Sequence, residues 1–347
     1  MENIKMPEMI KEPELTHEVL LCDNNGNLNK EAIGWSRNPL HTCNLKGHWP
    51  RKKRWNYWCV TNDKYLFSVT LSDVDYMGLP FIYILDFETG EFAEKTILSP
   101  FGKGCDLGEQ VRDTVDYRGK DMQIAMTYLN ERVHIEAVCN DLAGKTLKAD
   151  LWVTIPDGHE TLNVVIPWSD KRFQFTSKQN TLPAQGTIQW GEKLIQFEPQ
   201  TAFACLDLGR GMWPFSCFWN WSSFSTRLKD GRTVGVNLGA GWTDGTGMNE
   251  NGLCIDGHLI KLSEDMVFEY STGDFKAPWH LKTSVTDRVD LVFTPFFERV
   301  AKTDALIIRS EVHQMIGRFA GRLKTDEGEE ILIDNAIGWA EDHHARW

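Results

Sequence analysis

The sequence predicts an all-β protein built from antiparallel sheets, arranged as a sandwich or a barrel. From Trp55 onward, short runs of alternating apolar and polar residues recur about every ten residues, which is typical of such folds. Tight turn signals separate these runs, among them Asn62-Asp63 and LysAspGlyArg at 229–232, where Asp-Gly supplies positive φ angles. We find no long amphipathic helical pattern. The fold class therefore follows from strand rhythm, turn chemistry and the lack of helical periodicity.

The expected strands follow in chain order. Residues 1–50 are an extended segment with one short strand near Val19–Cys22. A first array covers 55–62, 65–75, 80–87, 92–98, 111–117, 121–129, 132–139, 146–155 and 161–167. A second covers 187–198, 201–208, 216–228, 232–242, 253–262, 266–271, 279–287, 289–297, 305–323 and 329–338, with one or two helical turns as an alternative at 301–312. The polar segment 176–186 contains Pro and Gly, so we expect an N-terminal β domain over 1–180 and a C-terminal β domain over 181–347.

Composition argues against several classes of protein, among them nucleic-acid-binding and membrane proteins. The net charge of −12 argues against nucleic-acid binding, which needs clustered Lys and Arg. No apolar run approaches the ~20 residues of a membrane helix, so no membrane insertion is expected. The charged N-terminus is not a signal peptide. Eight scattered cysteines without a CxxC pair fit reduced thiols, and we expect a cytoplasmic location.

The stretch Cys205–Asp256 carries the best candidates for chemistry, because charged residues lie among Trp and Gly on strands. Asp207, Asp244 and Glu250 are the acid–base candidates. A carboxyl group enclosed by Trp and Gly-rich backbone loses hydration, which raises its pKa and lets it donate a proton near neutral pH. Two structural alternatives stand beside this interpretation. Asp207 and Arg210 could form a buried ion pair, and Asp244 could cap an ordinary Asx-turn.

Fourteen Trp residues either fill large cores or line a ligand cavity with flat aromatic faces. The C-terminal GluAspHisHisAlaArgTrp is too rich in functional side chains for a frayed tail, so we expect it to fold back with Glu341 or Arg346 inward. A docked terminal strand that closes a barrel is the structural alternative. The predicted ligand-binding residues are Arg210, Trp213, Trp219, Trp221, Trp242, Asn249, Glu341 and Arg346.

Cofactor and metal motifs are missing from the sequence. It has no GxSxG elbow, HExxH helix, P-loop or Rossmann fingerprint, so we predict no cofactor. The glycines of 239–247 are better explained as a Gly-rich strand and turn than as a phosphate cradle. His343 and His344 are adjacent and would point to opposite faces of a strand, so we predict no metal site.

Four motifs together carry a resemblance. They are AspLeuGlyArgGlyMetTrpPro at 207–214, TrpAsnTrp at 219–221, AsnLeuGlyAlaGlyTrpThrAspGlyThrGly at 237–247 and MetIleGlyArgPheAlaGlyArgLeu at 315–323. They resemble a bacterial domain-of-unknown-function family of two-domain, lipocalin-like proteins, over roughly residues 15–347. More distantly, the chain is similar to carotenoid 1,2-hydratases, tocopherol cyclases and fungal Diels–Alderase-type cyclases. The resemblance implies two lipocalin-like barrels or half-barrels packed side by side, with a ligand cavity in or between them. None of those enzymes' catalytic residues maps onto a matched motif here, so none is transferred.

Three functions remain open at this stage. The first is a lyase, hydratase or isomerase that acts on an apolar or cyclic small molecule by carboxylate acid–base chemistry in a Trp-lined cavity. The second is a carbohydrate-active enzyme, which would need two carboxyl groups facing each other about 5 to 10 Å apart. The third is a non-catalytic, lipocalin-like ligand carrier. The sequence does not decide among these functions, nor does it give the substrate or the oligomeric state.

Overall fold

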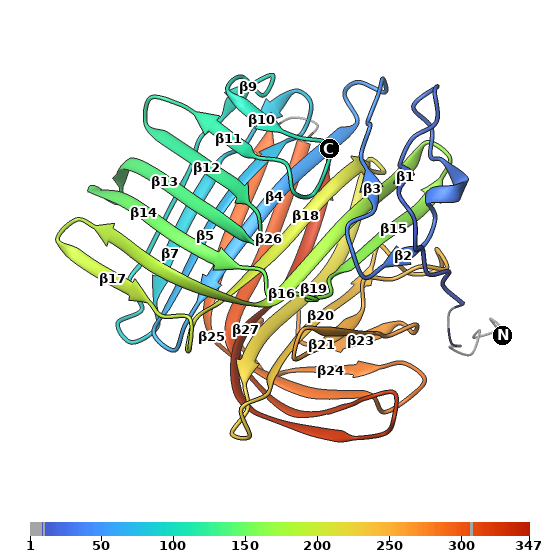
Figure 1. The fold of residues 1–347 in the computed structure, drawn as a ribbon. Coiled ribbons are helices and arrows are strands. Elements are labelled where there is room, and N and C mark those ends of the chain that lie inside the picture. Colours follow the sequence, from blue (N-terminus) through green and yellow to red (C-terminus); the bar gives the residue numbers. More distant parts are fainter. Residues whose placement is uncertain (1–8, 10, 306–307) are drawn as a thin grey trace. The chain divides into compact units, whose positions relative to one another are not determined.

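The computed structural model describes residues 9, 11–305 and 308–347, and strands dominate it (Figure 1). The chain forms two compact units. We call Leu15–Trp213 the N-terminal unit, and Pro214–Trp347 with the described residues before Leu15 the C-terminal unit. Each unit is a curled sheet whose strands pair antiparallel, except for one short parallel pair in the N-terminal unit. The expected all-β class with two lipocalin-like half-barrels is confirmed.

The N-terminal unit contains one large sheet and the parallel pair β1–β3. The path through the large sheet is β10-β11-β12-β13-β14-β16-β18-β4-β5-β6-β9, with β15, β17, β2, β7 and β8 attached beside it. The strand bounds are β1 Val19–Leu20, β2 Trp35–Ser36, β3 His41–Thr42, β4 Lys52–Thr61, β5 Tyr65–Asp73, β6 Met77–Gly78, β7 Phe81–Asp86, β8 Phe92–Thr96, β9 Ser99–Pro100, β10 Cys105–Leu107, β11 Val115–Arg118, β12 Met122–Leu129, β13 Arg132–Leu142, β14 Lys145–Thr154, β15 Leu162–Ser169, β16 Arg172–Trp190, β17 Lys193–Phe197 and β18 Phe203–Met212.

Two kinds of strand make up this sheet. Along β13 and β14 buried and exposed residues alternate, which is the pattern of a sheet with one face on the core and one in solvent. By contrast, β4, β5, β7 and β18 are buried on nearly every residue. Their apolar side chains, such as Trp58 and Leu206, join one large core on one face. The other face of these strands is also buried but carries polar residues, so this face is the candidate for a functional site.

The segment 176–186, where the sequence suggests a boundary, lies inside β16. The first half of β16 pairs with β15 and β18, and the second half pairs with β14 and β17. A register shift occurs between Gln179 and Leu182, and Thr181 and Gly186 have positive φ. The polar, Pro- and Gly-containing residues therefore mark the place where one strand changes partners. The compact units divide between Trp213 and Pro214.

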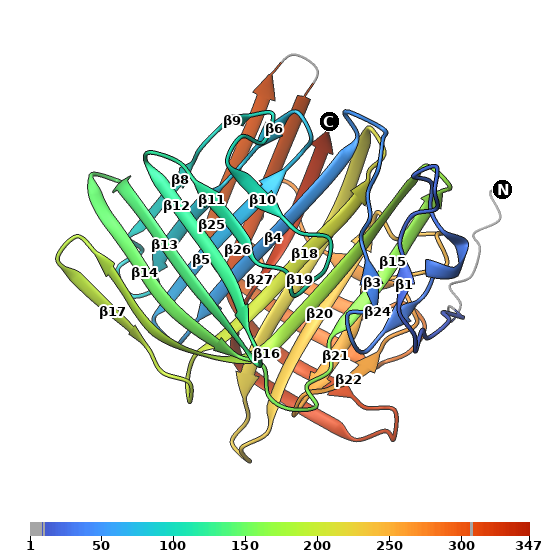
Figure 2. The ribbon, with the colours of Figure 1, turned by 45° about the horizontal axis from the view of Figure 1, so that its top comes forward.

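The C-terminal unit is a nine-stranded sheet in the order β22-β21-β20-β19-β27-β26-β25-β24-β23. Contacts between β20 and β23 bring distant parts of the sheet together, so it curls around its own core. Strands β25 and β26 run side by side as a long hairpin (Figures 1 and 2). The bounds are β19 Ser216–Arg227, β20 Thr233–Gly241, β21 Gly252–Ile255, β22 His258–Lys261, β23 Met266–Glu269, β24 Trp279–Thr283, β25 Val289–Ala305, β26 Ile308–Lys324 and β27 Glu330–Arg346.

Some strands differ from expectation in length. The expected strand 253–262 is a hairpin, because Asp256 and Gly257 both have positive φ and turn the chain. The C-terminal tail is part of β27, which pairs with β19 and β26 as far as Arg346. It is thus a docked terminal strand. Strands β25 and β26 occupy the described part of 301–312, and residues 306–307 of that stretch lie outside the described residues.

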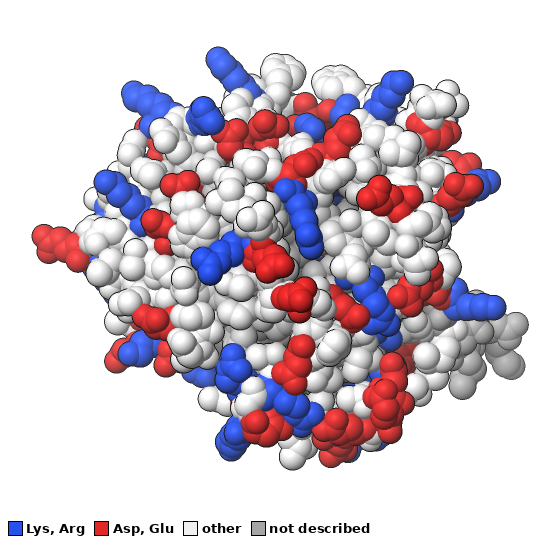
Figure 3. All heavy atoms as spheres, in the orientation of Figure 1, with Lys and Arg blue, Asp and Glu red and all other residues white. Residues whose placement is uncertain are grey.

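No helix in the described part of the chain is long and apolar enough to cross a membrane. The eight cysteines are free thiols. On the face shown in Figure 3, acidic and basic side chains are interspersed among uncharged ones.

One glycine in each unit produces the same local bend. Gly186 on β16 has a φ of +129°, and a Cβ there would lie 2.2 Å from the carbonyl oxygen of Asp150. Gly321 on β26 has a φ of +141°, and its Cβ would lie 2.2 Å from the carbonyl oxygen of Asp290. In both cases the next atom met belongs to a Leu, Leu151 or Leu291. The two sheets therefore curl with the same device, a glycine that lets a neighbouring backbone approach closely.

We expect Gly321→Ala to lower the free energy of unfolding by about 3 kcal/mol, because the added Cβ meets backbone and the φ is unfavourable for alanine. Urea denaturation followed by circular dichroism measures this loss. Gly273→Ala is the matched control, since its nearest neighbour is the Ser271 hydroxyl at 3.8 Å. If the two variants were equally stable, the backbone at position 321 would accommodate an alanine side chain and the bend would not require glycine.

Candidate functional site

A row of polar side chains crosses four neighbouring strands of the N-terminal unit. Lys178 on β16 lies opposite Asp207 on β18. On its other side, Asp207 lies opposite Tyr57 on β4. Tyr57 in turn lies opposite Thr70 on β5. Directly opposite residues of antiparallel strands project from the same face, so the four side chains are neighbours. The Nζ of Lys178 is 2.8 Å from Oδ1 of Asp207, and the Lys178 side chain is only 4% exposed. We call these residues, with Tyr83 and Ser68 described next, the polar row.

Tyr83 on β7 extends the row. Its hydroxyl lies 2.8 Å from that of Tyr57, and both rings are buried. Ser68 lies opposite Tyr83 in the pairing of β5 with β7. Ser68 Oγ and Thr70 Oγ1 are buried and have no hydrogen-bond partner among the described residues. A buried hydroxyl without a partner costs about 1 to 3 kcal/mol, so a water molecule or a polar ligand atom bound beside these two groups would be stabilising.

Aromatic rings stand beside the polar row on the same face. Trp55 lies two residues before Tyr57 on β4, and it covers Gly209, where a Cβ would meet the indole ring at 2.3 Å. The ring centroid of Trp55 is 4.7 Å from that of Trp213, and Trp213 is 6.0 Å from Trp168. Trp213, predicted as a ligand-binding residue, therefore belongs to an indole cluster next to Asp207's strand.

Arg210 does not pair with Asp207. The two residues are three apart on β18, so their side chains project from opposite faces. The guanidinium of Arg210 is buried and donates to the carbonyl oxygens of Trp55 at 2.7 Å and Gly209 at 3.0 Å. It also donates to Asn56 Oδ1 at 2.6 Å and to the Gly108 carbonyl at 3.2 Å. Burial lowers the pKa of Arg210 to about 10. The expected ion pair is thus replaced by Lys178–Asp207, and Arg210 ties backbone segments together.

Asp244, Asn249 and Glu250 lie in the C-terminal unit, so the structure does not place them in the polar row with Asp207. Asp244 is exposed, and its Oδ1 accepts a hydrogen bond from the Gly241 amide at 3.0 Å, as the Asx-turn alternative predicts. Loss of hydration still raises the pKa of its carboxyl group, and the hydrogen bond from the Gly241 amide opposes this. Glu250 is 2% exposed, and its carbonyl oxygen accepts from Asn237 Nδ2 at 2.6 Å.

Asn249 belongs to a buried ionic cluster that the sequence analysis missed. The ammonium of Lys261 donates to Glu12 Oε2 at 2.6 Å, to Asn249 Oδ1 at 2.5 Å and to the Leu262 carbonyl at 3.1 Å. Glu12 Oε1 accepts from the Asn249 amide at 2.8 Å. Burial is the main cause that lowers the pKa of Lys261, to about 8, and the nearby Glu12 opposes it. Every donor of this ammonium has a partner, so the cluster is complete without a ligand.

The predicted ligand-binding tryptophans of the C-terminal unit stack on protein groups. Trp219 lies 4.5 Å from Trp242 and 3.9 Å from His343, measured between ring centroids. Trp221 donates from Nε1 to Asn237 Oδ1 at 2.8 Å. Glu341 accepts from Gln314 Nε2 at 2.7 Å. These contacts explain much of the high Trp content as packing, and whether any of these residues also binds a ligand stays a prediction.

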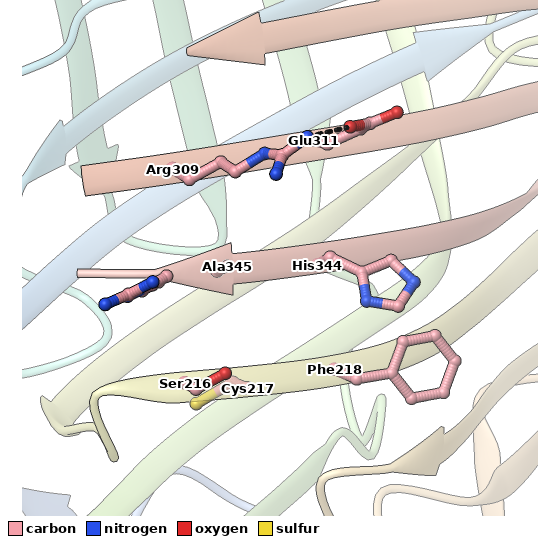
Figure 4. A pocket seen from close by; sticks show the side chains of 8 residues that line it. Ser216, Cys217, Phe218, Arg309, Glu311, His344 and Ala345 are labelled. Carbon is pink, nitrogen blue, oxygen red and sulfur yellow. Dashed lines mark ion pairs between the residues drawn. The ribbon is translucent and has the colours of Figure 1, made fainter. Parts of the chain in front are cut away.

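Arg346 lines an open groove of about 520 Å³ at the end of β19, β26 and β27 (Figure 4). The groove also contains His344, whose Nε2 lies 3.1 Å from Oδ1 of buried Asp342. Asp342 Oδ2 in turn accepts from the hydroxyl of Tyr270 at 2.5 Å. Burial and the Asp342 charge raise the pKa of Tyr270, so the phenol stays a donor. In the described part of the chain, no group of three or more His, Cys, Asp and Glu side chains has metal-binding geometry.

The sequence analysis found Asp207 but missed Lys178, Tyr57 and Tyr83, which share its face. A polar residue inside a strand that is otherwise buried on both faces is the signal that was available. It is visible at Lys178, which lies among the polar residues 176–180 taken as a boundary. Which polar residues meet across strands depends on register, and register is not readable from one strand alone.

Comparison with known proteins gives a family and a fold. Residues 12–347 match the family model described as "Domain of unknown function (DUF2804)", which confirms the resemblance drawn from the motifs. No curated protein matches the chain. Kievitone hydratase from Nectria haematococca superimposes with a TM-score of 0.51 at 10% identity, covering 99% of this chain and 98% of that one. The structure of CghA with Sch210972 gives a TM-score of 0.51 at 12% identity, covering 86% and 89%. At these identities the likeness concerns the fold.

We expect Lys261→Met to destabilise the protein by about 3 to 5 kcal/mol, because it leaves the Glu12 carboxylate buried without its counter-charge. The double variant Glu12→Gln/Lys261→Met should recover much of that loss. Urea denaturation of the two single variants and the double variant measures the coupling. Additive effects of the two substitutions would contradict a coupled buried pair.

The same pair predicts a pH dependence. The pKa of Lys261 is about 8 in the folded protein, against an ordinary value of 10.5. Between these pH values the unfolded chain binds more protons at this group, so stability rises with pH in that window. We therefore expect the unfolding free energy of the wild type, relative to the double variant without both charges, to increase from pH 8 to 10.5. A flat difference would show that the pKa of Lys261 is not lowered in the folded protein.

Proposed function

The chain belongs to the DUF2804 family, and from its fold and its polar row we propose that it is a small-molecule enzyme of the hydratase, lyase or isomerase type. One observation carries the proposal. An ion pair, two linked phenols and two buried hydroxyls without a protein partner among the described residues share one face of β16, β18, β4, β5 and β7. A plain core would hold apolar groups there, and a site for a polar reactant explains the unpaired hydroxyls.

The residues of the row suit addition of water to a double bond conjugated with a carbonyl group. The two phenols of Tyr57 and Tyr83 form a hydrogen-bonded pair that can donate to the oxygen on which negative charge develops. Asp207 is the proton acceptor, because Lys178 binds its Oδ1 and leaves Oδ2 for a water molecule. Ser68 and Thr70 provide hydroxyls that orient the water or the substrate.

In the proposed reaction, water adds across the double bond in two stages. The water oxygen forms a bond to the carbon distal to the carbonyl group, and its proton passes to Asp207. The π electrons move to the carbonyl oxygen, where the Tyr57–Tyr83 pair stabilises the enolate. The enolate then collapses, and the carbon next to the carbonyl group takes the proton back from Asp207. The reverse sequence is a dehydration. If Asp207 instead removes a proton from the γ carbon and returns it to the carbon next to the carbonyl group, through the same stabilised enolate, the double bond moves and the reaction is an isomerisation.

The indoles of Trp55 and Trp213 beside the row suit a flat or cyclic substrate body. Hydration is further supported by the fold shared with a protein named kievitone hydratase, and small-molecule binding by the fold shared with CghA. The carbohydrate-active alternative needs two facing carboxyl groups, and the polar row contributes one. A purely apolar carrier is disfavoured by an ion pair in the row.

The test is a turnover screen with cyclic enones and unsaturated phenolic ketones, followed by chromatography and mass spectrometry. We expect Asp207→Asn and Tyr83→Phe each to lower kcat by about 100- to 10,000-fold, because each removes a proton-transfer or oxyanion-binding group. Tyr117→Phe, which changes a buried tyrosine of β11, is the matched control and should keep full turnover.

The same screen separates this site from the other carboxylates predicted from the sequence. Asp244→Asn and Glu250→Gln should leave kcat within about threefold of the wild type, since neither residue belongs to the polar row. Full turnover by Asp207→Asn would contradict a catalytic role of the polar row. Loss of turnover in Glu250→Gln with an intact fold would indicate that the reaction takes place in the C-terminal unit. Circular dichroism and urea denaturation establish that each variant is folded.

A further inference from the structure

Two cysteines of the N-terminal unit face each other across neighbouring strands. Cys59 on β4 and Cys205 on β18 are directly opposite in the antiparallel pairing of these strands, which run side by side in Figure 1. Their exposed fractions are 1% and 5%, and both are free thiols. In the strand pairings of the described residues, no other cysteine lies opposite a second cysteine. The two residues are far apart in the sequence, so the pair is visible only in the fold.

The cysteine pair continues a line of side chains that belongs to the polar row. Ser68 on β5 is opposite Cys59, and Tyr83 on β7 is opposite Ser68. Cys205 lies two residues before Asp207 on β18, so both side chains project from the same face. Neither cysteine belongs to the apolar core on the other face of the sheet. The two thiols are therefore neighbours of the groups proposed to carry the chemistry.

The register of β4 and β18 suits a disulfide bond between the two thiols. Directly opposite residues of antiparallel strands have Cα atoms about 4.5 to 5.5 Å apart, within the range of about 4.4 to 6.8 Å found in disulfides. Their Cβ atoms are about 4.5 to 5.5 Å apart, whereas a disulfide brings the Cβ atoms to about 3.8 Å. The bond can thus form without a change of register, but the Cβ atoms must approach by about 1 Å. A disulfide that is strained in this way is easily reduced.

We propose that Cys59 and Cys205 form a redox-sensitive modification site, which hydrogen peroxide converts into a reversible cross-strand disulfide. The sulfur of Cys205, the more exposed of the two, attacks one peroxide oxygen. The O–O bond breaks, and a sulfenic acid and one water molecule form. The sulfur of Cys59 then attacks the sulfenic sulfur, the S–O bond breaks and a second water molecule leaves. The sulfurs supply the two electrons that reduce the peroxide, and the two thiol protons end in the two water molecules.

The hydroxyls of Ser68 and Thr70 offer a place where a peroxide can be held beside the cysteine pair. Both hydroxyls are buried and have no hydrogen-bond partner among the described residues. Hydrogen peroxide is small and both donates and accepts hydrogen bonds, so groups that a water molecule would stabilise also suit a peroxide. Ser68 is directly opposite Cys59, which puts a peroxide bound there next to the thiols.

The disulfide would act on the polar row through the two strands that it draws together. Tyr57 and Asp207 face each other in the next row of the same strands. A displacement of about 1 Å can cost about 100-fold in rate where reacting groups have to be held in position. We therefore expect the disulfide to slow the reaction proposed for the polar row. This consequence rests on the proposed function, whereas formation of the disulfide does not.

Thiol counting in the full-length protein tests the disulfide directly. Reduced protein, freed of reductant, is treated with dilute hydrogen peroxide, denatured and alkylated, and its peptides are mapped by mass spectrometry. We expect the number of alkylated cysteines to fall from eight to six, together with a linked peptide pair that contains Cys59 and Cys205. Dithiothreitol should restore all eight.

Two variants control this measurement. Cys205→Ser should give no linked peptide that contains Cys59. Cys139→Ser should keep the link between Cys59 and Cys205, because Met122 and Leu147, and no thiol, lie opposite Cys139. The proposal is overturned if peroxide leaves every cysteine open to alkylation, or if it links other cysteines while Cys59 and Cys205 remain alkylated.

Turnover measured before and after peroxide tests the effect on the polar row. We expect kcat of the wild type to be at least about tenfold lower in the oxidised protein and to recover with dithiothreitol. Turnover by Cys205→Ser should stay within about threefold of the reduced wild type under both conditions. An unchanged kcat in protein that carries the disulfide would overturn the effect on the polar row. If the reduced wild type shows no turnover, the proposed function fails, and the thiol count still decides whether the disulfide forms.

Discussion

The register of β18 between β16 and β4 is the constraint on which the N-terminal unit depends. In this register Leu206 and Leu208 enter the apolar core, and Asp207 meets Lys178 and Tyr57 on the other face. The same register puts Gly209 under the ring of Trp55, where no side chain fits. A slip by one residue would move every one of these groups to the wrong face. Core packing and the arrangement of the reactive groups are therefore fixed by one hydrogen-bond ladder.

Two buried ion pairs, Lys261–Glu12 and Lys178–Asp207, differ in how completely their polar surroundings are satisfied. Lys261 has three acceptors for its three donors, and both oxygens of Glu12 are bound, so this pair is closed to a ligand. In the polar row the Lys178–Asp207 pair lies beside buried hydroxyls that have no partner within the described chain. Unpaired buried hydroxyls are costly unless a water molecule or a ligand binds them. The hydroxyls of Ser68 and Thr70 therefore make the Lys178–Asp207 pair the better candidate for a site.

Period-two patterns were enough to predict the fold class and most strands, such as β13 and β14, because alternation reports directly on burial. They were not enough for β16, whose polar middle looks like a linker although all of the strand except Asn180 and Thr181 is paired. The site shows the same limit. Asp207 was found because it stands next to Gly and Trp in the sequence, but its neighbours Lys178 and Tyr57 come from distant strands. A strand's own pattern gives the face of a residue and not its partner. The sequence therefore offered Arg210 as a possible ion-pair partner of Asp207, whereas the partner in the structure is Lys178.

The C-terminal unit shows why a shared fold does not settle where a ligand binds. Phe224, Met315 and Ala340 belong to the apolar core that the sheet encloses. Along the same faces of β26 and β27, the next residues toward the strand ends are His313 and Asp342, followed by Glu311 and His344. The sheet therefore changes from apolar to polar along its length, and its titratable groups gather where the core ends. A deep carrier cavity would need the apolar part to be hollow, whereas this unit fills it with side chains and presents its charged groups at the rim.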